Sequence, residues 1–342
     1  MQSRAFITGV SGPDLTSAER EFIRSERPWG FILFKRNIET PEQVAILVKE
    51  LRESIDAPEA PVLIDQEGGR VQRLGPPHWP VYPPGAFFGA LYDLNPALGL
   101  SAARLGARLI AADLGDLGIS VDCLPLADVP VVGADAVIGN RAYGTEPEKV
   151  AAIARAVTDG LEQGGILPVL KHIPGHGRAT ADSHFGLPKV DTSKKELERT
   201  DFAAFQPLAD LPMAMTAHVV FSALDPAHPA TTSATIIEQV IRGVIGFQGL
   251  LMSDDVSMNA LSGSIAERTR AVFSAGCDVV LHCNGKLDEM RDVAAETPEL
   301  SGKALDRARR ALASRRAAQP FDREAARAEL DAMMSRAGTT GA

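Results

Sequence analysis

The sequence predicts an α/β protein built as a single (β/α)8 barrel, or TIM barrel, with elaborated βα loops. Strand-like apolar runs alternate with amphipathic helix-like segments, and this alternation is typical of a parallel sheet. Several runs are apolar throughout, as expected of strands that are covered on both faces. There are eight runs, which favours a closed barrel over an open sheet; they span residues 5–10, 30–34, 61–66, 119–128, 166–172, 213–218, 249–255 and 278–284.

The segments between these runs carry helix signals. Residues 40–55, TPEQVAILVKELRESI, begin with Thr40 as the predicted N-cap and Pro41 in the first turn. Residues 146–165 end in a glycine pair, which commonly stops a helix, and residues 232–246 are a third candidate. The turn TGVSGPDLT after the first strand is not a dinucleotide-binding fingerprint, which again favours the barrel.

Two regions depart from the alternation. Residues 66–99 contain six prolines, and we expect them to form a long loop after the third strand and one wall of the barrel mouth. From Ser301 onward the sequence is rich in Arg, Ala and Glu and is predicted to be helical. Because neither internal repeats nor a Pro/Ser-rich linker is present, we expect one barrel domain over residues 1–335, followed by a frayed tail over residues 336–342.

Composition excludes several classes of function. The 342 residues carry a formal net charge of −9 and no block of Lys or Arg, which argues against a nucleic-acid partner. No run approaches the length of a membrane span, and the N-terminus lacks the apolar segment of a signal peptide. The three cysteines lack metal-site spacing and are expected to be reduced and buried. We therefore expect a cytoplasmic protein without membrane contact.

Polar residues gather where the predicted strands end. In a barrel these ends converge on one mouth, so residues far apart in sequence would share a site. The residues concerned are Lys35, Arg36, Asp65, Asp128, Lys171, His172, His218, Asp254, Asp255, His282 and Asn284.

The stretch KHIPGHGRATADSHFGLP combines a strand end with a glycine-rich loop. Asp182 and His184 lie two residues apart, close enough for a carboxylate to orient an imidazole for proton transfer. An incidental pair on a surface loop is one alternative. Metal binding is another, but the spacing of His172, His176, Asp182 and His184 matches none of the common zinc patterns. We therefore expect no metal and no cofactor.

The stretch LMSDDVSM supplies adjacent carboxylates at the end of a strand. Neighbouring side chains of a strand point in different directions, so at most one of Asp254 and Asp255 faces a substrate at the barrel axis. A carboxylate nucleophile opposite a proton donor is the apparatus of retaining glycoside hydrolysis. The alternative for such a pair is the N-cap of a helix.

Further charged residues follow the third strand and precede the fifth. The motif IDQEGGRVQRL contains Asp65, Glu67, Arg70 and Arg73, and IGNRAYG contains Arg141. Carboxylates and guanidinium groups at a rim suit bidentate hydrogen bonding to sugar hydroxyls. For Arg73 and Arg141 a structural ion pair is the alternative.

These motifs, together and in this order, resemble the signatures of glycoside hydrolase family 3, in particular its short bacterial β-N-acetylhexosaminidases of the NagZ type. The resemblance extends over essentially the whole barrel. It implies a (β/α)8 fold, Asp254 as nucleophile, and His184 as acid/base with Asp182 as its partner. The positions it implies for sugar binding are Asp65, Arg73, Arg141, Lys171 and His172.

Small departures from the family pattern lie around Arg141. Asn140 stands where an acidic residue commonly precedes the arginine, and Ala142-Tyr143 replaces the usual Ser-Phe. Larger members of the family add a second domain that supplies a Glu acid. This chain has no room for that domain, which favours the subgroup that uses a histidine.

The resemblance implies a retaining exo-β-N-acetylglucosaminidase of peptidoglycan recycling. Its substrate would be a muropeptide fragment, N-acetylglucosamine joined to 1,6-anhydro-N-acetylmuramic acid with or without peptide, and we expect a monomer. A β-glucosidase or a broad exo-hexosaminidase of the same family is the alternative. A metal-dependent barrel hydrolase and a non-catalytic sugar-binding barrel are the hypotheses from other classes.

Overall fold

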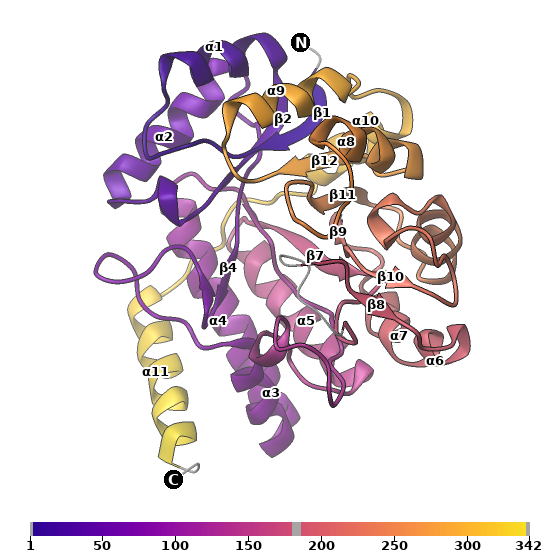
Figure 1. The fold of residues 1–342 in the computed structure, drawn as a ribbon. Coiled ribbons are helices and arrows are strands. Elements are labelled where there is room, and N and C mark those ends of the chain that lie inside the picture. Colours follow the sequence, from indigo (N-terminus) through magenta and orange to yellow (C-terminus); the bar gives the residue numbers. More distant parts are fainter. Residues whose placement is uncertain (1–2, 180–185, 340–342) are drawn as a thin grey trace.

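The chain forms a closed barrel of parallel strands. The computed structural model describes residues 3–179 and 186–339, with side chains described to residue 335 (Figure 1). In this part of the chain the barrel order is β1-β12-β11-β9-β7-β6-β3-β2. Each of the eight predicted runs overlaps one barrel strand, so the predicted (β/α)8 fold is confirmed. The strands are β1 Arg4–Thr8, β2 Pro28–Leu33, β3 Val62–Ile64, β6 Val121–Asp122, β7 Leu167–Ile173, β9 Met213–Thr216, β11 Leu250–Asp255 and β12 Val279–His282.

Strand β6 is much shorter than the apolar run 119–128 that predicted it. Regular pairing with β7 ends at Asp122, although Leu126 still bridges Lys171. Pro125 interrupts the run, and a proline has no N–H to give to a strand ladder. The rest of the run continues as buried, irregular chain toward the barrel mouth.

The apolar strands bury side chains on both faces. Ile7 and Ile32 belong to the cluster inside the barrel, whereas their neighbours Phe6 and Phe31 belong to the cluster between strands and helices. Successive side chains of a strand alternate between faces, so a strand buried on both must be apolar at every position. This accounts for the continuous apolar runs in the sequence.

Helices surround the barrel and follow the predicted caps. Thr40 caps α2 by accepting a hydrogen bond from the amide of Gln43, and α5 ends at Gly164. Residues 232–246, expected to be helical, contain a π-helix at Ile236–Val244. The α-helices are α1 Ser17–Glu26, α2 Pro41–Ser54, α3 Gly85–Leu94, α4 Pro96–Asp116, α5 Pro147–Gln163, α6 Lys194–Arg199, α7 Asp201–Phe205, α8 Ile265–Ala275, α9 Leu287–Glu296, α10 Gly302–Ala313 and α11 Arg323–Thr339. No described helix is long and apolar enough to cross a membrane.

The region 66–99 is not a loop throughout, contrary to the prediction. It begins with an antiparallel hairpin of β4 (Gln66–Gly68) and β5 (Val71–Gln72), and it continues into α3 and the start of α4. Prolines suggested a loop, but they precede the helices: Pro84 is the N-cap of α3 and Pro96 opens α4. Proline is tolerated at such positions because the first N–H groups of a helix have no intrahelical partner.

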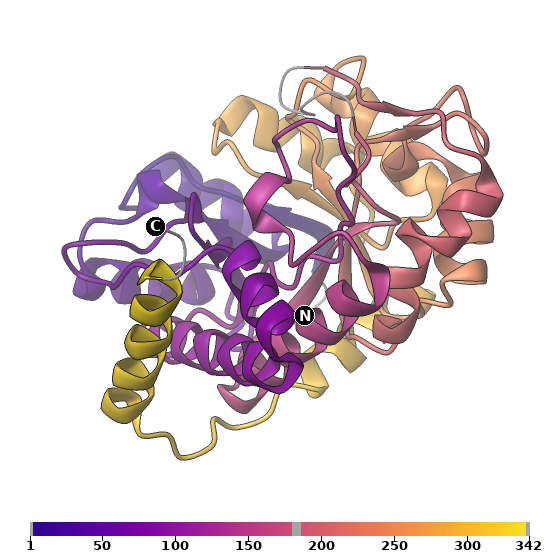
Figure 2. The same cartoon turned by 90° about the horizontal axis from the view of Figure 1, so that it is seen from below.

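Helix α11 packs outside the barrel along α4 (Figure 2). Leu330 of α11 is fully buried, and Arg323 makes an ion pair with Asp113 of α4. The hydroxyl of Tyr82 donates to the same Asp113 at 2.5 Å. The helix continues to Thr339.

Helix α3 supports the loop that carries Arg141, and the two approach closely at Gly85 and Gly89. A Cβ atom on Gly89 would lie 2.0 Å from the carbonyl oxygen of Tyr143, whereas one on the exposed Gly115 of α4 would meet nothing within 4 Å. We expect Gly89→Ala to lower the free energy of unfolding by about 1–3 kcal/mol through overpacking. The matched change Gly115→Ala should not lower it, because alanine favours a helix. Urea unfolding of both variants tests this; equal stability would contradict the close approach.

Candidate active site

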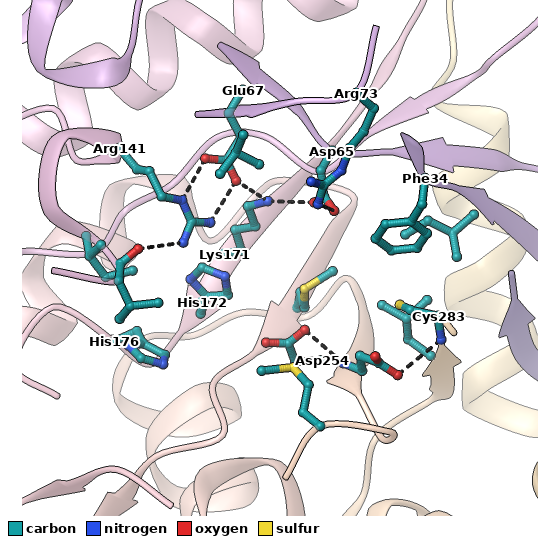
Figure 3. Close-up of a pocket in the computed structure, with 18 of the residues that line it drawn as sticks. Phe34, Asp65, Glu67, Arg73, Arg141, Lys171, His172, His176, Asp254 and Cys283 are labelled. Atoms are coloured by element: carbon teal, nitrogen blue, oxygen red, sulfur yellow. Dashed lines mark hydrogen bonds and ion pairs between the residues drawn. The ribbon is translucent and has the colours of Figure 1, made fainter. Parts of the chain in front are cut away.

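A cavity of about 310 Å³ lies at the carboxyl ends of the barrel strands (Figure 3). Six of the eight residues expected to act in catalysis or sugar binding line it: Asp65, Arg73, Arg141, Lys171, His172 and Asp254. Glu67, Arg70 and Asp255 line it as well. Asp182 and His184 lie outside the described residues. The barrel thus brings together side chains from separate strands and loops, as the strand-end pattern predicted.

Other strand-end residues do not line this cavity. Asp128, His218 and His282 are fully buried behind it. Arg36 turns to the main chain, where it donates to the carbonyl groups of Val10 and Cys283. The expectation that all of them face one mouth was therefore wrong, because strand-end side chains also point between strands and into the surrounding layer.

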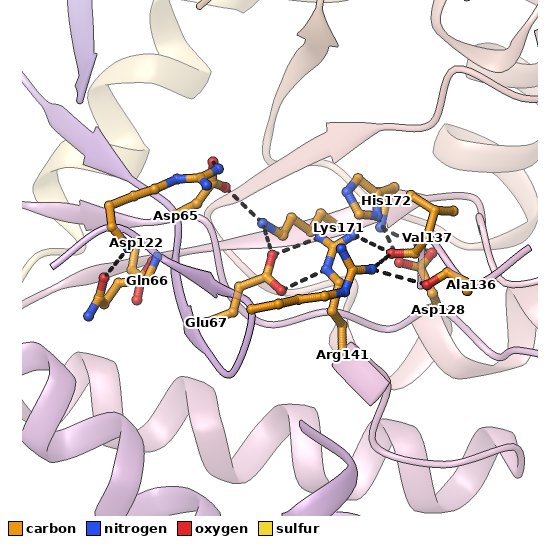
Figure 4. A network of polar contacts seen from close by, with 12 residues as sticks. Asp65, Gln66, Glu67, Asp122, Asp128, Ala136, Val137, Arg141, Lys171 and His172 are labelled. Atoms are coloured by element: carbon orange, nitrogen blue, oxygen red, sulfur yellow. Dashed lines mark hydrogen bonds and ion pairs between the residues drawn. The ribbon is translucent and has the colours of Figure 1, made fainter. Parts of the chain in front are cut away.

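Charged side chains alternate in sign along one wall of the cavity (Figure 4). The Arg73 guanidinium lies 2.9 Å from the Asp65 carboxylate. The Lys171 ammonium lies 2.9 Å from Asp65 and 2.6 Å from Glu67. Arg141 makes two bonds of 2.8 Å to Glu67 through Nε and Nη2. Both arginines therefore form the ion pairs named as alternatives, within the candidate site itself.

Burial and charge determine the ionisation of this group. Burial alone would raise the pKa of both carboxyls, but Lys171 and Arg73 hold the pKa of Asp65 well below its usual range. Lys171 and Arg141 likewise lower the pKa of Glu67 to about 2. Burial would lower the pKa of Lys171, but Asp65 and Glu67 raise it. The group therefore stays charged across the neutral range.

Gln66 holds the hairpin that presents the two carboxylates. Its side chain is fully buried; Nε2 donates to the carbonyl of Leu74 at 2.9 Å, and Oε1 accepts from the amide of Arg73 at 2.9 Å. Alternation along the chain turns Gln66 away from the face of Asp65 and Glu67. Sequence reasoning missed this role; the only signal is an amide between two acids.

Asp128 orients His172 from behind. The Nδ1 atom of His172 lies 2.7 Å from Oδ2 of Asp128, and Oδ1 of Asp128 accepts from the amide of His176 at 2.7 Å. Because the pKa of Asp128 is lowered, with His172 outweighing burial, the carboxylate is the acceptor and Nδ1 carries the hydrogen. This leaves Nε2 of His172 for a partner other than Asp128.

His176 is neutral at neutral pH. Burial, followed by the nearby charge of His172, lowers the pKa of His176 to about 4. It lines the same cavity, with its ring 5.6 Å from that of His172.

Asp254 and Asp255 have different partners at the end of β11. Oδ1 of Asp254 accepts from the amide of Asp255 at 2.8 Å. Burial would raise the pKa of Asp254, but His218 and His172 lower it, so the carboxylate is ionised. The Asp255 side chain instead accepts from the amides of Ser257, at 2.9 Å, and Cys283, at 3.1 Å.

The remaining wall of the cavity is largely apolar. Phe34, Met215, Met258, Leu281 and Cys283 line it, and the guanidinium of Arg73 lies 5.1 Å from the centre of the Phe34 ring. In Figure 3, Asp254 faces the charged wall across the cavity. Among the described residues, no group of three or more His, Cys, Asp or Glu side chains is placed to hold a metal ion.

Replacement of Glu67 tests the energetics of the charged wall. The folded pKa of Glu67 is about 2 against a usual value of 4.5, so its ionised form contributes stability above about pH 4.5 that is lost as the pH falls toward 2. We expect Glu67→Gln to lower the free energy of unfolding at neutral pH. The difference in the free energy of unfolding between the wild type and Glu67→Gln should become smaller as the pH falls from about 5 to about 2.5.

The exposed Glu53, paired with Lys49 at 3.7 Å, provides the control. Glu53→Gln should change the free energy of unfolding little at neutral or at acidic pH, because exposed ion pairs contribute little to stability. Urea unfolding at several pH values measures all three proteins. A gap between wild type and Glu67→Gln that is independent of pH would contradict the role of the Glu67 charge.

Comparison with known proteins agrees with this architecture. The Glycosyl hydrolase family 3 N terminal domain matches residues 8–314. A beta-hexosaminidase of Alkalilimnicola ehrlichii is 39% identical over 282 residues, covering 81% of this chain and 80% of the relative. The crystal structure of NagZ from Neisseria gonorrhoeae in complex with N-trifluoroacetyl-D-glucosamine has a TM-score of 0.82 at 31% identity, covering 97% of this chain and 98% of that one.

One of the similar structures belongs to a longer chain. This chain matches a family 3 β-N-acetylglucosaminidase from Paenibacillus sp. with a TM-score of 0.82 at 29% identity, over 93% of its own length but only 63% of the other chain. The family match, the curated relative and the shared barrel agree with the motifs in the sequence. The chain belongs to glycoside hydrolase family 3 and is a β-N-acetylhexosaminidase of the NagZ type.

Proposed function

We propose that this enzyme is a retaining exo-β-N-acetylglucosaminidase in which Asp254 is the nucleophile. The observation that carries the proposal is the ionised carboxylate of Asp254, which faces a wall of fixed charges across the cavity (Figure 3). A nucleophile must be unprotonated at working pH, and His218 and His172 lower the pKa of Asp254 accordingly. The side chain of Asp255 accepts from the amide and the hydroxyl of Ser257, which leaves Asp254 for the substrate.

The reaction proceeds by two displacements. In the first, a carboxylate oxygen of Asp254 attacks the anomeric carbon while the glycosidic C–O bond breaks, and the leaving oxygen takes a proton from His184. In the second, water gives a proton to His184 and attacks the same carbon, which releases Asp254. Two inversions at one carbon return the β configuration to the product.

The assignment of His184 as acid/base, with Asp182 as its partner, rests on the family resemblance. Both lie outside the described residues, and their role depends on matching the family's DSH signature. The residues just before residue 180 make described contacts. Arg178 forms an ion pair with Asp201 at 2.6 Å, and the amide of Asp135 donates to the carbonyl of Ala179 at 2.8 Å.

The charged wall is the proposed sugar-binding surface. Asp65, Arg73, Arg141, Lys171 and His172 match the family positions and line the cavity. Because the ion pairs fix these groups before substrate arrives, the cost of ordering them on binding is small. Carboxylate oxygens with unused lone pairs and Nε2 of His172, the ring nitrogen that does not contact Asp128, would meet sugar hydroxyls.

The proposed substrate is a muropeptide fragment, N-acetylglucosamine on 1,6-anhydro-N-acetylmuramic acid with or without peptide, recycled in the cytoplasm by a monomeric enzyme. Support comes from the likeness to a NagZ that binds N-trifluoroacetyl-D-glucosamine. The alternative is a β-glucosidase or a broad exo-hexosaminidase. Relative kcat/KM values on aryl N-acetylglucosaminide and aryl glucoside separate these functions.

Replacement of Asp254 tests the nucleophile. Asp254→Ala should lower kcat by about 10⁴-fold or more, because the covalent step is lost. Asp255→Asn, which keeps an acceptor oxygen for the amides of Ser257 and Cys283, should lower it far less. A 2-fluoro-sugar inactivator followed by peptide mass spectrometry should label Asp254. Labelling of Asp255, or an active Asp254→Ala enzyme, would refute the assignment.

Leaving-group dependence tests the acid/base residue. A stable phenolate leaves without help from an acid, whereas a sugar alkoxide needs a proton. His184→Ala should therefore retain a much larger fraction of activity on activated aryl glycosides than on a natural disaccharide, and azide should partly rescue turnover of the aryl glycoside. Asp182→Ala should show the same pattern in milder form. Equal losses on both substrates, without rescue, would transfer the role to another residue such as His176.

A further inference from the structure

We propose that His218 is a positioning residue for the nucleophile, acting through the main chain that follows Asp254. The inference rests on the proposed role of Asp254. His218 does not line the cavity and is fully buried. It therefore cannot serve as the acid, the base or a sugar ligand, and its contacts must explain why an imidazole stands there.

The ring of His218 links the end of β11 to a short helix and, through that helix, to β9. Its Nε2 atom lies 2.9 Å from the carbonyl oxygen of Asp255, which can only accept, so Nε2 carries a hydrogen. Its Nδ1 atom lies 2.7 Å from the hydroxyl of Thr231 in the short helix η4 (Ala230–Thr232). That hydroxyl in turn lies 2.8 Å from the hydroxyl of Thr216 on β9.

The peptide unit after Asp255 is thus held at both ends. The amide of Val256 donates to the carbonyl of Leu281 on β12 at 3.0 Å, while His218 donates to the carbonyl of Asp255 from the β9 side. Strand β11 lies between β9 and β12, so its two neighbours hold the turn from opposite sides. The amide of Asp255 donates to the Asp254 carboxylate, which transmits this constraint to the nucleophile.

The hydroxyl relay explains why the imidazole keeps its orientation. Thr216, Thr231 and His218 are all at most 1% exposed, so their polar atoms have no bulk water to bond with. An imidazole ring that lost Thr231 could tilt, and the carbonyl of Asp255 would then keep the amide of Met258 as a donor but lose the one from the β9 side. A displacement of about 1 Å at a reacting group can cost roughly 10²-fold in rate.

The test compares His218→Phe with His218→Gln. Phenylalanine keeps a planar ring but cannot donate, whereas the Nε2 of glutamine can reach the same carbonyl. We expect His218→Phe to lower kcat on an aryl N-acetylglucosaminide by roughly 10- to 100-fold with little change in KM, and to slow inactivation by the 2-fluoro sugar to the same extent. His218→Gln should recover most of both rates.

Variants of the relay cover the case in which His218→Phe fails to fold. Thr231→Val should lower kcat, Thr231→Ser should restore it, and Thr232→Val should have no effect, because the hydroxyl of Thr232 donates to the carbonyl of Pro229 and not to the relay. Circular dichroism and thermal unfolding identify variants that fold. Wild-type kcat in folded His218→Phe or in Thr231→Val would overturn the proposal, as would a loss in His218→Gln equal to that in His218→Phe.

The parallel Asp254→Ala enzyme separates the two ideas. If Asp254→Ala is inactive while the His218 and Thr231 variants match the wild type, only the positioning role is wrong. If Asp254→Ala is active, the proposed nucleophile is wrong, whatever the His218 variants do.

Discussion

A buried ammonium group between two carboxylates organises the mouth of this barrel. Lys171 is 2% exposed, and removing its charge from water is costly unless the surroundings compensate. Asp65 and Glu67 compensate it, but two carboxylates around one ammonium leave an excess negative charge. Arg73 and Arg141 pair with these carboxylates at the two ends, so three cations and two anions leave the wall with a small net positive charge. Each charge is tolerated in the interior because the next one is present, so the wall forms as a unit.

This constraint links several separate elements. Lys171 comes from β7, Asp65 follows β3, Glu67 lies in the hairpin β4–β5, and Arg141 belongs to the loop seated on α3. Gln66 closes the hairpin behind the carboxylates, and Gly89 lets α3 approach the loop. Helix α3 therefore serves the site, although it supplies no group that lines the cavity.

The side of the cavity that carries Asp254 is held by main-chain contacts, whereas the opposite wall is held by charges. Asp254 is fixed by its neighbour's amide, and that turn is held by β12 on one side and His218 on the other. The charged wall thus presents fixed charges, while the opposite wall holds the ionised carboxylate of Asp254 in place. A preorganised site of this kind needs little rearrangement during reaction.

The sequence by itself predicted the barrel, the caps of α2 and α5, and eight candidate site residues. Six of these eight residues line the cavity. The barrel and the caps follow from local rules of apolar alternation and capping side chains, whereas the site residues follow from the convergence of strand ends together with the motifs of the family. The same rules failed for α3, where prolines just outside a helix were taken as signs of a loop. They also could not show that 236–244 would form a π-helix.

Only the tertiary structure decided which polar groups became partners. Lys171 and Asp65 are 106 residues apart, Arg141 and Glu67 are 74 apart, and His172 and Asp128 are 44 apart. No local pattern encodes such pairs, because they depend on barrel register and on which face each side chain takes. The roles of Asp128 and His218 behind the cavity emerged for the same reason. A strand-end residue can face the substrate or stand behind a residue that does, and packing alone determines which.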